Sequence, residues 1–97
     1  MHPASYMITN FFDKAMNAKG LKLFAASNER FFAMDSSFET VFKFDLFCSS
    51  SDFTCYVLAK DSDGELTQEH SVNIAWTDGP AIREFMEYVQ GMRVTSA

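Results

Sequence analysis

The sequence has few of the residues that cross-link, target or anchor a chain. It contains two cysteines, four glycines and two prolines among 97 residues. The opening Met-His-Pro-Ala-Ser-Tyr lacks the basic and apolar regions of a secretory signal. No stretch approaches the roughly 18 consecutive apolar residues of a membrane span. These absences predict a cytoplasmic protein with no membrane partner, in which both cysteines stay reduced.

Residues arranged for catalysis or cofactor binding are equally scarce. Neither of the two histidines, His2 and His70, has a nearby partner for a catalytic triad. There is no glycine-rich phosphate loop. Thirteen acids in so short a chain will form some close pairs by chance. We therefore predict a protein that is not an enzyme and has no cofactor or metal; a small hydrolase using His70 is an alternative without a nameable substrate.

Aromatic bulk is abundant. Eleven phenylalanines and six methionines supply a core for one domain spanning residues 1–97. Each fully buried Phe contributes roughly 1.5–3 kcal/mol, so disulfides are not required for stability.

Hydrophobic periodicity predicts a helix, five strands and a second helix. Ser5 is a candidate cap for a first helix that ends at Gly20, with apolar residues recurring at helical spacing. Residues 21–26 and 30–34 predict a hairpin, followed by strands at 38–48 and 53–60 and a last strand ending near Trp76. Thr77-Asp78-Gly79-Pro80 is typical of a helix start.

This order indicates the α+β class, with an antiparallel sheet of about five strands and two amphipathic helices on one face. The other face is expected to be polar and to meet water or a partner. Its predicted residues are Thr54, Tyr56, Lys60, Thr67, Glu69, Ser71 and Asn73.

Alternation in the third and fourth strands also predicts a register. Symmetrical pairing about the turn at residues 49–52 gives the pairs Cys48–Cys55, Leu46–Val57 and Phe44–Ala59. The two cysteines would then be neighbours on the core face. A disulfide is conceivable in this geometry, but an inert, buried pair of thiols is the favoured interpretation.

The tract Asp-Ser-Asp-Gly-Glu-Leu at residues 61–66 is similar to the middle of an EF-hand calcium loop. Aligning Gly64 with the invariant glycine, however, puts Ala59 at the first ligand position and His70 at the last. Because the flanking residues alternate as strands do, we predict a hairpin turn here.

Charge is distributed unevenly along the chain. Residues 1–30 hold four bases and two acids, a net of +2, whereas residues 31–97 hold four bases and eleven acids, a net of −7, which gives −5 in total. Such a surface repels nucleic acid and favours a basic protein partner. The candidate partner-binding residues are Asp61, Asp63, Glu65, Glu69, Asp78, Glu84 and Glu87.

Aromatic and basic residues also occur together in the first hairpin, a combination used to bind single-stranded nucleic acid. They are Phe24, Phe31, Phe32, Lys19, Lys22 and Arg30. We predict that these phenylalanines fill the core instead.

In length, acidity and layout, the chain resembles the small phage-encoded anti-CRISPR inhibitors that mimic DNA. The resemblance covers the whole chain in outline and rests on no motif. It implies a binding protein that occupies the DNA-binding channel of a CRISPR ribonucleoprotein in the cytoplasm of a bacterial host.

Two alternatives remain. The chain could be a self-associating or accessory interaction module of phage or bacterial origin, which buries its hairpin aromatics or an exposed strand edge. The acidic surface could also serve only to keep a Phe-rich domain soluble. The sequence leaves the oligomeric state open.

Overall fold

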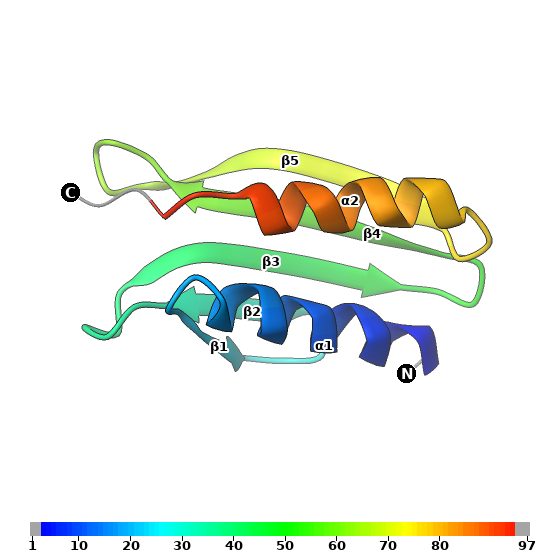
Figure 1. The fold of residues 1–97 in the computed structure, drawn as a ribbon, viewed down its shortest axis with the longest axis horizontal. Helices are drawn as coiled ribbons and strands as arrows, with labels where there is room; N and C mark the ends of the chain where they lie inside the picture. The colour runs from blue at the N-terminus through cyan, green and yellow to red at the C-terminus, as the bar shows by residue number, and fades with distance from the viewer. Residues whose placement is uncertain (1–2, 95–97) are drawn as a thin grey trace.

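The computed structural model describes residues 3–94 of the chain. The order is helix, five strands, helix, so the predicted α+β class is confirmed (Figure 1). The elements are α1 (Pro3–Asn17), β1 (Lys22–Ala25), β2 (Arg30–Met34), β3 (Thr40–Cys48), β4 (Asp52–Lys60), β5 (Leu66–Ala75) and α2 (Gly79–Gly91).

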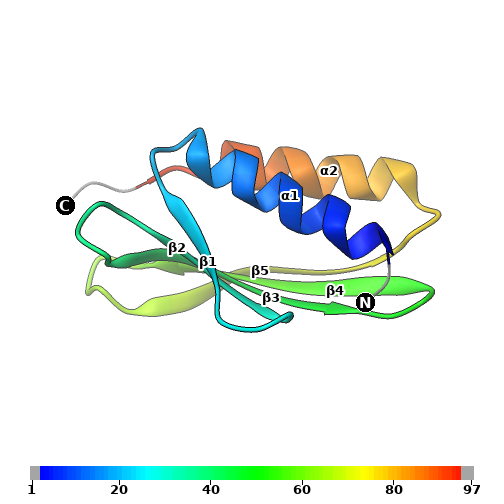
Figure 2. The ribbon, with the colours of Figure 1, turned by 90° about the horizontal axis from the view of Figure 1, so that it is seen from below.

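The strands form one antiparallel sheet in sequence order, β1-β2-β3-β4-β5. Figure 2 shows α1 and α2 side by side on the same side of this sheet. No described element covers the opposite side, which is called the open face below. Neither described helix is long and apolar enough to cross a membrane.

Phenylalanine rings fill the space between the two layers. Phe12 of α1 is fully buried and stacks on Phe44 of β3, with ring centroids 4.3 Å apart. The ring of Phe85 from α2 lies 6.2 Å from Phe12 and 5.8 Å from Phe53 of β4. Edge-on and offset contacts of this kind add to the gain from burial. One aromatic cluster therefore joins both helices to the centre of the sheet.

The first helix starts earlier than predicted. It begins at Pro3, so Ser5 lies inside the first turn rather than at the cap. Proline is well suited to a first helical turn because its fixed φ is helical and it has no N–H to satisfy. Ser5 is buried. His2 lies outside the described residues.

The predicted register of β3 and β4 is wrong by two residues. Leu46 pairs with Cys55 and Phe44 with Val57, and the connecting turn is centred between Ser50 and Ser51. Ser49 tightens this turn, because its hydroxyl accepts hydrogen bonds from the backbone N–H groups of Ser51 and Asp52. A two-residue slip leaves every side chain on the same face, so alternation alone could not distinguish the two registers.

The two cysteines are consequently not paired across the strands, and both are free thiols. Cys55 is buried, and burial raises the pKa of its thiol far above the ordinary value, with smaller contributions from Asp45 and Cys48. Cys48 ends β3 opposite Phe53 and is exposed. The prediction of a buried pair therefore holds for Cys55 and is wrong for Cys48.

Side chains fix both ends of α2. At its start, the Asp78 carboxylate accepts a hydrogen bond from the backbone N–H of Ala81 at 3.1 Å, as the sequence predicts for a cap. At its end, the Lys19 ammonium donates to the carbonyl oxygens of Gln90 and Met92, at 2.7 and 2.5 Å. A positive charge here also complements the helix dipole. The turn after α1 thus anchors the end of α2.

Replacing Phe12 with alanine should remove the contact on which both layers converge. We expect Phe12→Ala to lower the free energy of unfolding by about 3–5 kcal/mol, measured by urea denaturation. The matched control is Phe38→Ala, since the Phe38 side chain is 75% exposed; it should change stability by less than ~0.5 kcal/mol. Equal losses in the two variants would contradict the central role of Phe12.

Candidate binding surface formed by β5 and α2

The whole net charge of the chain lies in its last part. Residues 1–60 hold six acids and six bases, whereas residues 61–97 hold seven acids and two bases, a net of −5. The second segment contains the β4–β5 turn, β5 and α2. These elements lie together along one side of the molecule (Figure 1).

Two of the seven predicted partner-binding carboxylates serve local structure. Asp61 accepts hydrogen bonds from the backbone N–H groups of Asp63 and Glu65, both at 2.9 Å. Gly64 has a φ of +81°, a conformation that favours glycine, so the predicted hairpin turn is confirmed. Asp78 caps α2. Asp61 and Asp78 therefore hold backbone groups in addition to contributing charge.

A β-bulge in β5 changes the predicted direction of Glu69. Val57 of β4 pairs with His70, but the next residue, Leu58, pairs with Gln68, which leaves Glu69 as an extra residue in the ladder. Glu69 was predicted to point to the open face. It instead lines a hollow beneath α2 together with Glu87 and Tyr88.

The same bulge reverses the remaining alternation toward the start of β5. Thr67 was also predicted on the open face, but it pairs with Ala59, which packs against the core under the helices. Because directly paired residues share a face, Thr67 lies on the helix side. Strict alternation of faces along the sequence cannot predict where a bulge adds a residue to the strand.

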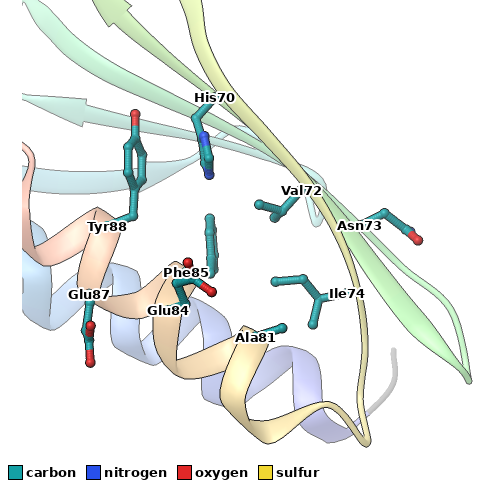
Figure 3. A pocket seen from close by; sticks show the side chains of 9 residues that line it. All are labelled: His70, Val72, Asn73, Ile74, Ala81, Glu84, Phe85, Glu87 and Tyr88. Carbon is teal, nitrogen blue, oxygen red and sulfur yellow. The ribbon is translucent and has the colours of Figure 1, made fainter.

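Beside β5 lies a groove of about 620 Å³, here called the β5–α2 groove. Val72 and Ile74 from the strand and Ala81 and Phe85 from the helix face one another across it (Figure 3). The other lining residues are His70, Asn73, Glu84, Glu87 and Tyr88, so two lining residues are acidic and none is a lysine or an arginine. An apolar floor is thus combined with a negative rim.

His70 and Tyr88 form one end of this groove. Their rings stack with centroids 4.1 Å apart and an interplanar angle of 25°. Burial, and secondarily the negative charge of Glu69, raises the pKa of the Tyr88 hydroxyl. Within residues 3–94, no cluster of three or more His, Cys, Asp or Glu could hold a metal ion.

A second hollow of about 460 Å³ continues past Tyr88 toward the end of α2. Glu69 and Glu87 line it, but so do Lys60 and Arg93, so its charge is balanced. The Lys60 ammonium also lies 3.1 Å from the Glu39 carboxylate. The excess of negative charge is consequently greatest around the β5–α2 groove and at the β4–β5 turn.

The structure brings five of the predicted carboxylates onto this side without pairing them to bases. Across residues 3–94, the ion pairs engage only Asp45 and Glu39 among the acids. The five residues, here called the acidic edge, are Asp63, Glu65, Glu69, Glu84 and Glu87. The β4–β5 turn, which holds Asp63 and Glu65, lies at the end of the molecule where α2 finishes, and the turn between β5 and α2, which holds Asp78, lies at the opposite end (Figure 1). Glu69, Glu84 and Glu87 lie between them, along the two hollows.

The open face is more aromatic than predicted. Phe24, Phe47 and Tyr56 are exposed there, at 40%, 45% and 37%. Phe47 and Tyr56 contact each other edge to face at 6.1 Å. Thr54, Ser71 and Asn73 lie on this face as predicted, whereas Lys60 lines the second hollow beneath α2. Strands β1, β2 and β3 add aromatic rings to the open face.

The first hairpin explains part of this difference. Phe31 is buried as predicted, whereas Phe24 and Phe32 pair with each other on the open face, and the prediction that they fill the core is wrong. The Lys43 ammonium lies 6.0 Å from the Phe32 ring centroid. Adjacent residues of a strand point to opposite faces, so Phe31 and Phe32 could never both be buried by the same two helices. That signal was present in the sequence.

No protein-family model, curated protein or solved structure matches this chain. The chemistry of its surfaces is therefore what bears on function.

The electrostatic effect of Glu69 on Tyr88, which lines the same hollow, gives a test of the bulge. We expect Glu69→Gln to lower the pKa of Tyr88, because removing the nearby negative charge makes the phenolate less unfavourable. The measurement is a pH titration of the Tyr88 ring signals by NMR. Glu65→Gln, on the β4–β5 turn, is the matched control and should leave the titration unchanged. An unaltered Tyr88 pKa in Glu69→Gln would place Glu69 on the open face after all.

Proposed function

We propose that this protein is a non-enzymatic inhibitor that binds a basic, nucleic-acid-binding surface of another macromolecule through its acidic edge. The observation that carries the proposal is the concentration of the entire net charge of −5 in the β4–β5 turn, β5 and α2. Unpaired carboxylates on one side of a domain attract a complementary positive surface and set its orientation.

In this mechanism the carboxylates take the positions of phosphates. Duplex DNA carries one charge about every 1.7 Å of its axis, whereas same-face residues of a strand recur about every 7 Å. Glu84 and Glu87, three residues apart on α2, add a second row beside Glu69. The edge therefore imitates some of the phosphates, and the bulk of the domain, 39 Å along its longest axis, excludes the rest of the nucleic acid.

The resemblance to acidic anti-CRISPR inhibitors selects the first target to test, the DNA-binding channel of a CRISPR surveillance complex. Such a target is basic because it must hold nucleic acid. We propose contact with the protein surface of the complex and none with nucleic acid directly.

Reversing charges on the acidic edge should abolish binding. The variant Glu69→Lys, Glu84→Lys, Glu87→Lys changes the net charge from −5 to +1, since each substitution adds two charges. We expect it to lose the ability to displace labelled target DNA from purified CRISPR surveillance complexes, measured by fluorescence anisotropy. Inhibition by the natural sequence should weaken as salt increases.

The matched control is Asp13→Lys, Glu29→Lys, Glu39→Lys, which reaches the same net charge through exposed acids elsewhere. It should retain most of the inhibition, and both variants should keep the natural circular dichroism spectrum. Undiminished inhibition by the acidic-edge variant would reject the proposed function.

The open face favours a second candidate function, a self-associating or accessory interaction module. Three exposed aromatic side chains, Phe24, Phe47 and Tyr56, lie on a sheet face that no described element covers. Exposed aromatic groups of this kind mark surfaces that bury against a partner.

Salt and mutation separate this candidate from the first. If the open face mediates self-association, Phe24→Ser with Phe47→Ser should convert the protein to a monomer in sedimentation equilibrium, because it removes apolar area from the contact. Association of the natural sequence should not weaken at high salt, since it does not depend on charge. A protein that is monomeric before any substitution would exclude self-association through this face.

A further inference from the structure

We propose that β5 accepts an extended, basic segment of the partner as a sixth strand, with alternate lysine or arginine side chains entering the β5–α2 groove. This inference rests on the proposed function and specifies how part of the partner is held. It requires a free strand edge, a groove whose lining residues have the spacing of alternate residues in a strand, and a negative charge beside that groove.

The free edge is that of β5. This ten-residue strand pairs only with β4 and is the last strand of the sheet. Within the described residues, no hydrogen bond outside the sheet ladder uses the backbone of residues 66–74. Half of the backbone groups of an edge strand point outward, where they can pair with an added strand.

The bulge sets the limits of such an addition. The extra residue at Glu69 breaks the regular ladder, so pairing is available along residues 70–75, up to the Ala75 carbonyl oxygen, which already accepts a hydrogen bond from the backbone N–H of Asp78. At about 3.4 Å per residue, this stretch holds a segment of roughly six residues.

The lining residues of the groove have the same spacing as side chains on one face of an added strand. His70, Val72 and Ile74 are alternate residues of β5 and all line it. An added strand has the same spacing of about 7 Å between side chains on one face. Its alternate side chains would therefore lie over the floor formed with Phe85 and Ala81 (Figure 3).

The chemistry of the groove selects lysine or arginine at these alternate positions. The aliphatic stem of either side chain can pack on Val72, Ile74 and Phe85 while its charged end remains near water. Glu84 and Glu87 on the helix rim then lie beside that charge. The groove supplies no base to oppose it.

The same charge disfavours a second copy of this chain as the occupant. Two β5 edges joined about a two-fold axis would bring the acidic rims of both copies to one interface. Like charges facing each other destabilise such pairing. A basic segment of another protein is thus the better fit.

The probe is a capped peptide of alternating lysine and valine, about eight residues long, titrated into the full-length, ¹⁵N-labelled protein. We expect backbone amide shifts concentrated in residues 70–75 and in α2. A peptide of the same composition with its lysines contiguous should bind at least tenfold more weakly, because it cannot place alternate charges over the groove.

Two N-methylated versions of the peptide test strand addition itself. In one the backbone nitrogens of the lysines are methylated, and in the other those of the valines. In an extended peptide, the N–H groups of the lysines point to one edge and those of the valines to the other. Only one of these edges can pair with β5, so the version methylated on that edge should lose at least tenfold in affinity. Parent-like binding by both would overturn the proposal.

Matched protein variants locate the site. Glu84→Lys with Glu87→Lys should weaken peptide binding at least tenfold, whereas Asp13→Lys with Glu29→Lys, which adds the same charge, should keep the affinity within a few-fold. Shifts confined to the open face or to the β4–β5 turn would overturn the proposal. So would a dimer formed through residues 70–75, because the occupant would then be a second copy.

The result also separates this inference from the proposed function. If the peptide fails to bind while the natural protein still displaces DNA from a purified complex and the acidic-edge variant does not, the proposed function stands and strand addition is rejected. If the peptide binds as described but charge reversal leaves DNA displacement unchanged, the proposed function fails while the groove remains a peptide site.

Discussion

Burial of aromatic rings between two helices and one face of a sheet is the constraint on which the rest of this structure depends. Phe12, Phe44, Phe53 and Phe85 come from four different elements and meet in one cluster. Because this cluster holds α2 above β4 and β5, it also determines where the carboxylates of α2 lie relative to those of β5. The core is therefore what assembles the acidic edge, although no acidic residue contributes to it.

The two surfaces of the molecule differ in chemistry. The side formed by the β4–β5 turn, β5 and α2 has the net negative charge and the groove, whereas the open face has exposed aromatic rings and bases such as Arg30 and Lys43. Asp45 lies between these two bases and within 3.4 Å of each. A partner that recognises charge and a partner that buries apolar area would therefore contact different faces, and one domain could hold both.

The acidic edge depends in part on an irregularity in the sheet. A regular β5 would direct Glu69 to the open face, and the rim near Tyr88 would lose that carboxylate. The inserted residue instead puts Glu69 and His70 next to each other on the helix side, where they border the two hollows. It also interrupts the outer edge of the strand, which limits uncontrolled pairing with other chains. The bulge thus adds a carboxylate to the acidic edge and restricts which chains can pair with the outer edge of β5.

The sequence by itself determined the order of the elements, the turn at Asp61 to Gly64, the cap at Asp78 and the excess of acids in the second half of the chain. Each of these depends on neighbours in sequence, through periodicity, turn chemistry or simple counting. Only the tertiary structure decided that Leu46 lies opposite Cys55, that Glu69 lies beneath α2, and that Phe24 and Phe32 lie on the open face. Register and bulges follow from how whole strands fit together over the core. An alternating pattern looks the same after a slip of two residues, and it does not reveal where one extra residue is inserted.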